Sequence, residues 1–126
     1  MKKRVLVIDD DPRMLRSIKI QLQDVYDIII VTNGKNALEY LFSHDVDIIL
    51  LDYIMPDEDG PHVLQSIREI PLFQNIPIIF LTGVSDKDKV KKGLDLNPQG
   101  YLLKPISRDH LIKTIDKVLN INNKLH

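Results

Sequence analysis

Aspartates follow two largely apolar runs of this chain, and their positions are the first indication of chemistry. The triplet Asp9–Asp11 ends the run Val5–Ile8, and Asp52 ends the run Val46–Leu51. Ionised carboxylates repel one another, so a site that holds several of them away from water needs a compensating positive charge. A hard divalent cation with oxygen ligands provides that charge, and Mg²⁺ is favoured because it needs few protein carboxylates. The pattern therefore points to phosphoryl chemistry.

Two further apolar runs end in groups that suit a phosphate. Thr82 follows Ile76–Leu81 with a hydroxyl group, and Lys104 follows Tyr101–Leu103 with an ammonium group. If the four runs are parallel strands, their carboxyl ends lie at one edge of a sheet, where open α/β sheets bind ligands. Each residue alone would be read as a turn, a cap or a solvated side chain. Together they predict a phosphate site.

The third aspartate of the triplet has a different expected role. Asp11 stands directly before Pro12, a residue that suits the first turn of a helix. A carboxylate at that place accepts hydrogen bonds from the free backbone N–H groups of the helix and interacts favourably with its dipole. We therefore expect Asp11 to cap a helix.

Strands and helices are expected to alternate along the chain. The helical segments carry apolar residues three and four positions apart, as in Leu15, Ile18 and Leu22. The weakest helix is the fourth, residues 86–96, which is rich in lysine and contains a glycine, whereas Ser107 is expected to cap the fifth. The predicted strands are Val5–Asp9, Ile28–Thr32, Val46–Asp52, Ile76–Thr82 and Tyr101–Lys104.

Strict alternation of this kind predicts an α/β fold with a parallel sheet covered on both faces. Because crossover connections are right-handed, few topologies remain, and we expect a doubly wound five-stranded sheet with five helices in three layers. The 126 residues fit a single domain, with a core of about 3–119 and a frayed polar tail at 120–126.

Composition excludes several classes of function. The net charge of −1 gives no bulk attraction to nucleic acid or membrane, and the absence of cysteine excludes disulfides, thiolate metal sites and a cysteine nucleophile. No apolar stretch is long enough to span a bilayer or to form a secretory leader. We expect a cytoplasmic protein, either stand-alone or a piece of a longer chain.

The strand-end residues and their neighbours resemble the receiver domain of two-component response regulators. The resemblance extends from about Lys3 to Leu119. It implies a flavodoxin-like fold with strand order 2-1-3-4-5. The matching segments are VIDDD at 7–11, LLDYIMPDEDG at 50–60, FLTG at 80–83 and GYLLKP at 100–105.

The resemblance implies a role for each acid of the site. Asp52 would accept a phosphoryl group from a phosphohistidine and hold it as an acyl phosphate. Asp10 and Asp52 would ligate Mg²⁺ directly, the backbone carbonyl of Ile54 would be a third ligand, and Asp9 would act through bound water. The chain would then be a phosphoacceptor signalling domain that catalyses only its own phosphorylation and dephosphorylation.

The resemblance also implies how the remaining residues act. The hydroxyl of Thr82 would donate to a phosphoryl oxygen, and Lys104, joined to Pro105 by a cis peptide bond, would neutralise charge. Tyr101 would be the switch residue, turning inward as Thr82 moves. The responding face would be formed by the fourth helix, the fifth strand and the fifth helix, with Arg108 on or near it.

Partners follow from the same resemblance. The phosphoryl donor would be a sensor histidine kinase or a histidine phosphotransfer protein. The output would be a downstream protein or a missing output domain, with no direct binding of nucleic acid or membrane. The chain would be a monomer or a phosphorylation-dependent dimer.

The chain departs from many relatives beside the phosphoacceptor. Ile54 and Val84, two residues beyond Asp52 and Thr82, are apolar where relatives often carry polar groups, and Asn97-Pro98 alters the approach to the fifth strand. In receiver domains, the positions of Ile54 and Val84 flank the path of the water that hydrolyses the acyl phosphate. We therefore expect slow dephosphorylation.

Three other functions compete with this reading. A haloacid-dehalogenase-like phosphatase also uses an aspartate nucleophile and Mg²⁺, but it needs a second aspartate where this chain has Ile54, and a cap domain. A flavodoxin-like cofactor binder requires a phosphate-cradling loop after the first strand rather than three acids. A receiver-like docking module that is never phosphorylated would not need the complete set of Asp10, Asp52, Thr82 and Lys104.

Overall fold

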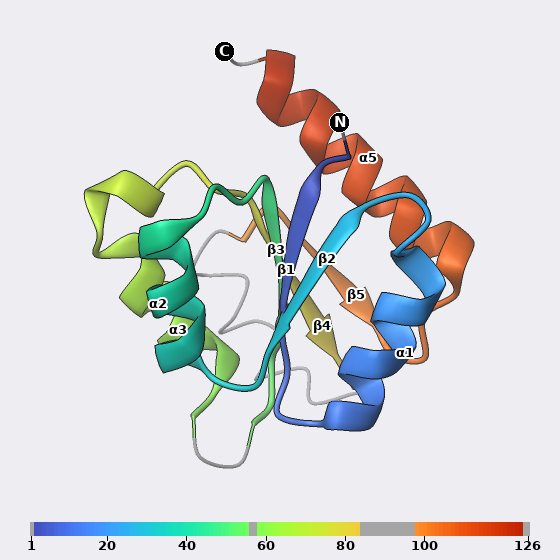
Figure 1. Cartoon of the computed structure of the whole chain (residues 1–126), viewed down its shortest axis with the longest axis horizontal. Helices are drawn as coiled ribbons and strands as arrows, with labels where there is room; N and C mark the ends of the chain where they lie inside the picture. The colour runs from blue at the N-terminus through green and yellow to red at the C-terminus, as the bar shows by residue number, and fades with distance from the viewer. Residues whose placement is uncertain (1, 56–57, 84–97, 125–126) are drawn as a thin grey trace.

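Five short strands form one parallel sheet in the order β2-β1-β3-β4-β5 (Figure 1). The structure is a computed structural model that describes residues 2–55, 58–83 and 98–124. The predicted fold class and strand order are confirmed. The strands are β1 Arg4–Ile8, β2 Asp27–Val31, β3 Ile48–Asp52, β4 Ile78–Thr82 and β5 Gly100–Leu103.

The burial of each strand follows its place in the sheet. All five residues of β3 and of β4 are buried, which explains why their sequences are continuous aliphatic runs rather than alternating ones. The edge strands β2 and β5 bury fewer residues and leave some side chains facing water. The two strands that carry Asp52 and Thr82 are therefore the most firmly packed in the sheet.

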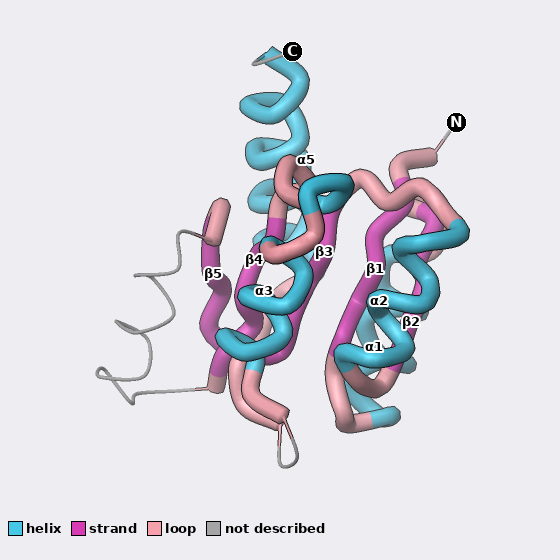
Figure 2. The backbone as a smooth tube through the Cα atoms, turned by 90° about the vertical axis from the view of Figure 1, so that its left-hand side faces the viewer, coloured by secondary structure: helices cyan, strands magenta, loops and turns pink. Residues whose placement is uncertain are grey.

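Helices cover both faces of this sheet (Figure 2). On one face, α1 (Pro12–Leu22) and α5 (Arg108–Lys124) pack in a single core cluster. On the other, α2 (Gly34–Ser43), α3 (Gly60–Arg68) and the short 3₁₀ helix η1 (Pro71–Phe73) enclose a second cluster. The three predicted layers are present, while the predicted fourth helix, 86–96, lies outside the described residues.

Polar residues define where the helices begin. Asp11 accepts a hydrogen bond from the backbone nitrogen of Arg13 at 2.9 Å, so its predicted capping role is confirmed. Asn33 caps α2 and Asp59 caps α3 in the same way. The hydroxyl of Ser107 accepts from the backbone nitrogen of His110 at 3.2 Å, as expected for the cap of α5.

The last helix is longer than the sequence indicated. α5 continues to Lys124, so residues 120–124, expected to be a frayed tail, are helical. No glycine or proline interrupts the chain between Arg108 and Lys124, and the helix therefore has no local reason to stop at Leu119. Within the described residues no helix is both long and apolar enough to cross a membrane.

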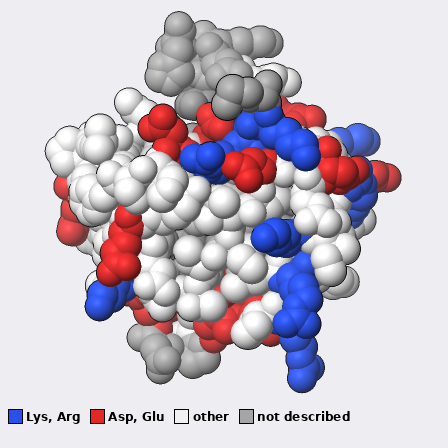
Figure 3. All heavy atoms as spheres, in the orientation of Figure 1, with Lys and Arg blue, Asp and Glu red and all other residues white. Residues whose placement is uncertain are grey.

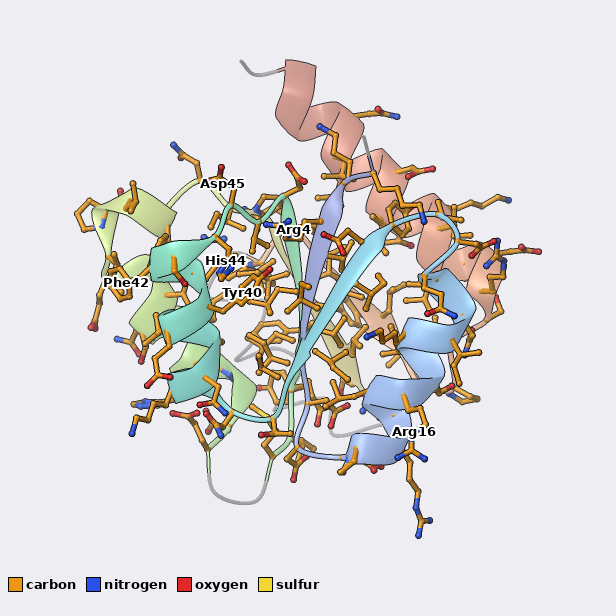
Figure 4. The ribbon with its side chains drawn as sticks, in the orientation of Figure 1. Arg4, Arg16, Tyr40, Phe42, His44 and Asp45 are labelled. Carbon is orange, nitrogen blue, oxygen red and sulfur yellow. The ribbon has the colours of Figure 1, made fainter. Side chains whose placement is uncertain are left out.

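Uncharged surface gathers on the α2 and η1 side of the molecule (Figure 3). Phe42 and Leu72 are 63% and 76% exposed, and the ring of Phe42 meets that of Phe73 edge to face. Figure 4 shows Phe42 on the outer side of the molecule, with Tyr40 and His44 nearer the sheet. The last two rings stack with their centres 4.1 Å apart.

Candidate functional site

The carboxyl ends of β1, β3 and β4 hold the buried polar residues of the described chain. Among these residues, the buried polar or charged side chains are those of Asp9, Asp52 and Thr82. Asp9 directly follows β1, whereas Asp52 and Thr82 end β3 and β4. Burying a charged group is costly unless another group compensates it, so three polar side chains at one edge call for a functional explanation.

Strand register fixes these side chains with little freedom. Asp52 lies opposite Leu81 in the β3–β4 pair, and the next backbone nitrogen, that of Tyr53, donates to the carbonyl of Leu81 at 2.8 Å. The backbone nitrogen of Asp9 donates to the carbonyl of Val31 at 3.2 Å. Regular pairing therefore continues to the site itself.

Three carboxylates form a cluster suited to a cation. One carboxylate oxygen from each of Asp9, Asp10 and Asp52 lies within 4.8 Å of the other two. Asp9 and Asp52 are buried, while Asp10 is exposed at the mouth of the cluster. The donors are all oxygen atoms, which a hard divalent ion prefers, so the residues fit the metal that the sequence predicted.

Lys104 supplies the positive charge within the cluster. Its Nζ donates to Oδ1 of Asp52 at 2.9 Å and lies 3.4 Å from Oδ2 of Asp9. Burial opposes the charged ammonium, but the hydrogen bonds to Asp52 and Asp9 and the charges of these two acids together outweigh it, and the pKa of Lys104 is raised. One lysine faces three acids, so the described cluster retains an excess of negative charge.

The pKa values of two of these acids are raised above their usual range. Burial raises the pKa of Asp52 to about 6, although the hydrogen bond from Lys104 opposes the shift. Burial and the neighbouring Asp9 also raise the pKa of Asp10. A bound divalent cation would favour the ionised form of both groups.

The side chain of Thr82 is hydrogen-bonded to the next residue, and that of Tyr101 is exposed. The hydroxyl of Thr82 donates to the carbonyl of Gly83 at 2.9 Å, and the side chain of Tyr101 is 40% exposed. The peptide bond between Lys104 and Pro105 is cis, as the resemblance implied. The backbone nitrogen of Lys104 donates to the carbonyl of Thr82 at 2.7 Å, which joins these two predicted site residues.

Gly60, the first residue of α3, lies against the backbone of Asp52. A Cβ atom on Gly60 would lie 2.5 Å from the backbone oxygen of Asp52, so only glycine allows this approach. The backbone nitrogen of Gly60 donates to the carbonyl of Tyr53 at 2.8 Å. Gly60 belongs to the segment 50–60 that resembles receiver domains, but its contact with the backbone of Asp52 depends on packing that no local pattern reveals.

A hollow lies at the opposite edge of the sheet, where β1 and β2 begin. Its volume is about 790 Å³, and its lining includes Arg4, Tyr26 and Asp47. Basic and acidic side chains are equal in number there: Lys2, Arg4 and Lys19 line the hollow with Asp27, Asp45 and Asp47, and Nε of Arg4 lies 2.9 Å from Oδ2 of Asp27. The unbalanced charge, and with it the chemistry, remains at the carboxyl edge.

Comparison with known proteins agrees with this geometry. A sequence model described as the response regulator receiver domain matches residues 5–116. The chain is 35% identical over 113 residues to the transcriptional regulatory protein DltR of Streptococcus agalactiae, covering 89% of this chain and 50% of that protein. It is 36% identical over 103 residues to a Vibrio cholerae protein named "Probable cyclic di-GMP phosphodiesterase", covering 82% of this chain and 23% of that protein.

A solved structure with the same fold is also similar to this chain. The chemotaxis protein CheY4 of Vibrio cholerae superposes with a TM-score of 0.86 at 27% identity, covering 94% of this chain and 99% of that one. The chain thus spans half or less of the two curated relatives, and the match covers nearly all of the solved CheY4 chain.

Proposed function

Because the chain belongs to the response regulator receiver family, a class of signalling domains, we propose that Asp52 is its phosphoacceptor. The observation that carries the proposal is the position of this carboxylate. It is buried at the end of β3, 2.9 Å from Nζ of Lys104 and in one cluster with Asp9 and Asp10. A phosphoryl group bound there would meet positive charge on one side and the acids that hold a cation on the other.

The proposed reaction transfers a phosphoryl group between two proteins. A carboxylate oxygen of Asp52 forms a bond to phosphorus, the bond from phosphorus to the donor's histidine nitrogen breaks, and that nitrogen keeps the electron pair. Lys104 is already in place to neutralise charge on the transferring group. The hydroxyl of Thr82, now bonded to Gly83, turns to donate to a phosphoryl oxygen.

We propose Mg²⁺ as the metal, which would neutralise charge on the phosphoryl oxygens. Asp10 and Asp52 would hold it directly together with the main-chain carbonyl of Ile54, and Asp9 would act through water. The oxygen-only donor set and the excess negative charge support this assignment. The side chain of Ile54 is 53% exposed and therefore does not form part of the core. The proposed ligand at this position is the main-chain carbonyl, which any residue type provides.

The proposed switch couples Thr82 to Tyr101 and to the face formed by the predicted fourth helix, β5 and α5. Tyr101 lies on β5 beside β4, opposite Phe80, close in the sheet to Thr82. Arg108 begins α5 and makes two hydrogen bonds of 2.8 and 2.9 Å to Asp24, beyond the end of α1. Movement at this face would therefore reach α1 as well.

The partners we propose are a sensor histidine kinase or histidine phosphotransfer protein as donor, and a protein or further domain as output. The two curated relatives carry different names and are at least twice as long as their matched parts, which supports outputs that lie outside the receiver. We further propose a cytoplasmic location. The proposed oligomeric state is a monomer or a phosphorylation-dependent dimer.

Acetyl phosphate tests the assignment directly. Incubation with Mg²⁺ should add the mass of one phosphoryl group to the intact protein, and omission of the metal or Asp52→Asn should prevent it. An amide is neither a comparable nucleophile nor an anionic ligand. Undiminished labelling of the Asn variant would place the phosphoryl group elsewhere, and absence of labelling in the parent would favour a docking module.

A further inference from the structure

A carboxylate in the loop between β3 and α3 reaches the beginning of a neighbouring helix. Glu58 lies six residues after Asp52 and four after Ile54. Its Oε1 accepts a hydrogen bond of 2.9 Å from the backbone nitrogen of Gly34, the first residue of α2.

The two residues fit one another closely. A Cβ atom on Gly34 would lie 2.5 Å from Oε1 of Glu58 and 3.1 Å from Cγ2 of Val63. None of the described glycines has a positive φ, so Gly34 is not required for an unusual backbone conformation. Its lack of a side chain leaves the space that this carboxylate occupies.

The contact completes the start of α2. Asn33 caps the helix by accepting from the backbone nitrogen of Asn36 at 2.8 Å, and its carbonyl accepts from that of Ala37 at 3.1 Å. The N–H of Gly34 would otherwise be one of the unpaired donors of the first turn. A carboxylate placed there also gains from the positive end of the helix dipole.

The same contact holds the loop that leads away from the phosphoacceptor. The beginning of the loop is fixed by the bond from Tyr53 to Leu81, and its end by the bond from Gly60 to Tyr53. Between these points lies the main-chain carbonyl of Ile54. The side chain of Glu58 connects this loop to α2.

We propose that Glu58 is a positioning residue for the metal site. By tying the β3–α3 loop to the start of α2, it fixes the main-chain carbonyl of Ile54 in the place where that oxygen ligates Mg²⁺. The inference rests on the proposed function, because it assumes that Mg²⁺ binds among Asp10, Asp52 and Ile54. Loss of the tie lets the loop move and weakens metal binding without removing a ligand.

Metal titration of Glu58 variants tests the inference. Isothermal titration with Mg²⁺ should give a dissociation constant about tenfold higher for Glu58→Ala, as is usual when a group that orients metal ligands is removed. Glu58→Gln keeps an acceptor for Gly34 and should change the constant less. Glu39→Gln is the matched control, because Glu39 is an exposed acid that lines the same groove between α2 and α3.

A second variant removes the contact without removing the charge. Gly34→Ala should push the carboxylate aside and raise the dissociation constant in the same direction as Glu58→Ala. Amide hydrogen exchange at Ile54 and Met55 should become faster in both variants. A purely structural role would lower the melting temperature while leaving the Mg²⁺ constant within twofold of the parent, and that result would overturn the inference.

The outcomes separate this inference from the proposed function. If the parent takes up phosphate from acetyl phosphate but the Glu58 variants bind Mg²⁺ like the parent, only the positioning role fails. If the parent binds Mg²⁺ in a Glu58-dependent manner but is never phosphorylated, only the phosphoacceptor role fails. A parent that binds no Mg²⁺ would overturn the positioning role before any variant is made.

Discussion

Asp52 is a residue whose placement favours chemistry over stability. It is 5% exposed, shares its surroundings with two other acids, and among the described residues has Lys104 as its neutralising partner. The hydrogen bond from Lys104 offsets only part of the free-energy cost of burying this carboxylate, since the pKa of Asp52 is still raised. The free energy that this buried carboxylate costs the folded protein can be measured by replacing it with a neutral amide.

In metal-free buffer at pH 7, Asp52→Asn should be more stable than the parent by roughly 1–3 kcal/mol. The folded-state pKa of about 6 lies above the unfolded value near 4, so the stability that the protonated group contributes is present below pH 4 and is lost as pH rises through 6. Urea unfolding with a chelator at pH 4 and pH 7 should show the difference only at pH 7. A less stable Asn variant at pH 7 would mean that the bond to Lys104 outweighs burial.

Ile54 offers a second test at the scale of one residue. Its half-exposed apolar side chain gives an attacking water no hydrogen-bond partner, so Ile54→Asn should speed loss of the phosphoryl group. A tenfold faster decay corresponds to only about 1.4 kcal/mol in the barrier. Val84, the other apolar position in this prediction, lies outside the described residues.

Decay is followed by intact mass after removal of acetyl phosphate. The control is Ile20→Asn, since Ile20 is 64% exposed on α1 and the substitution changes polarity away from the loop after Asp52. If both variants decay at the parent's rate, access of water is not governed by this side chain.

At the scale of elements, the buried ring of Tyr26 links the segment before β2 to α5. The hydroxyl of Tyr26, just before β2, donates to Oδ1 of Asp116 in α5 at 2.6 Å, and its ring is 3% exposed. Burial and this bond to a carboxylate raise the pKa of Tyr26. The hydroxyl therefore stays protonated in the fold, and its stabilising contribution persists up to pH 10 and is lost above it.

Tyr26→Phe should lower the free energy of unfolding by about 1.5–3 kcal/mol, because one hydrogen bond to a charged group is lost while the ring remains. A double-mutant cycle with Asp116→Asn measures the coupling between the two side chains. Additive effects of the two substitutions would show that the bond contributes nothing beyond the packing of the ring.

At the scale of the whole molecule, much of the fold could be read from the sequence. Each strand is a short aliphatic run, and each carboxyl end is a single position, so Asp9, Asp52, Thr82 and Lys104 could be assigned to one edge before any coordinates were known. The order of the strands followed from resemblance, and the sheet has that order. Local patterns suffice where the relevant interaction is local or repeats along an element.

Contacts between elements could not be predicted in this way. The bond from Gly34 to Glu58 joins residues 24 positions apart, and that from Tyr26 to Asp116 joins residues 90 apart. Similarly, Oε1 of Gln99 accepts from Arg68 at 3.1 Å and from the backbone of Ile78 at 2.8 Å. Such pairs depend on the packing of helices against the sheet, which no single segment encodes.

The hydrogen bond from Thr82 to Gly83 has a consequence for background signalling. If the hydroxyl must leave that carbonyl to reach a phosphoryl group, as proposed, the bond biases the unphosphorylated protein toward rest. One hydrogen bond of about 1 kcal/mol lowers the resting population of the alternative state about fivefold. The noise of an idle pathway would then be set in part by a single hydroxyl group and the carbonyl of the residue beside it.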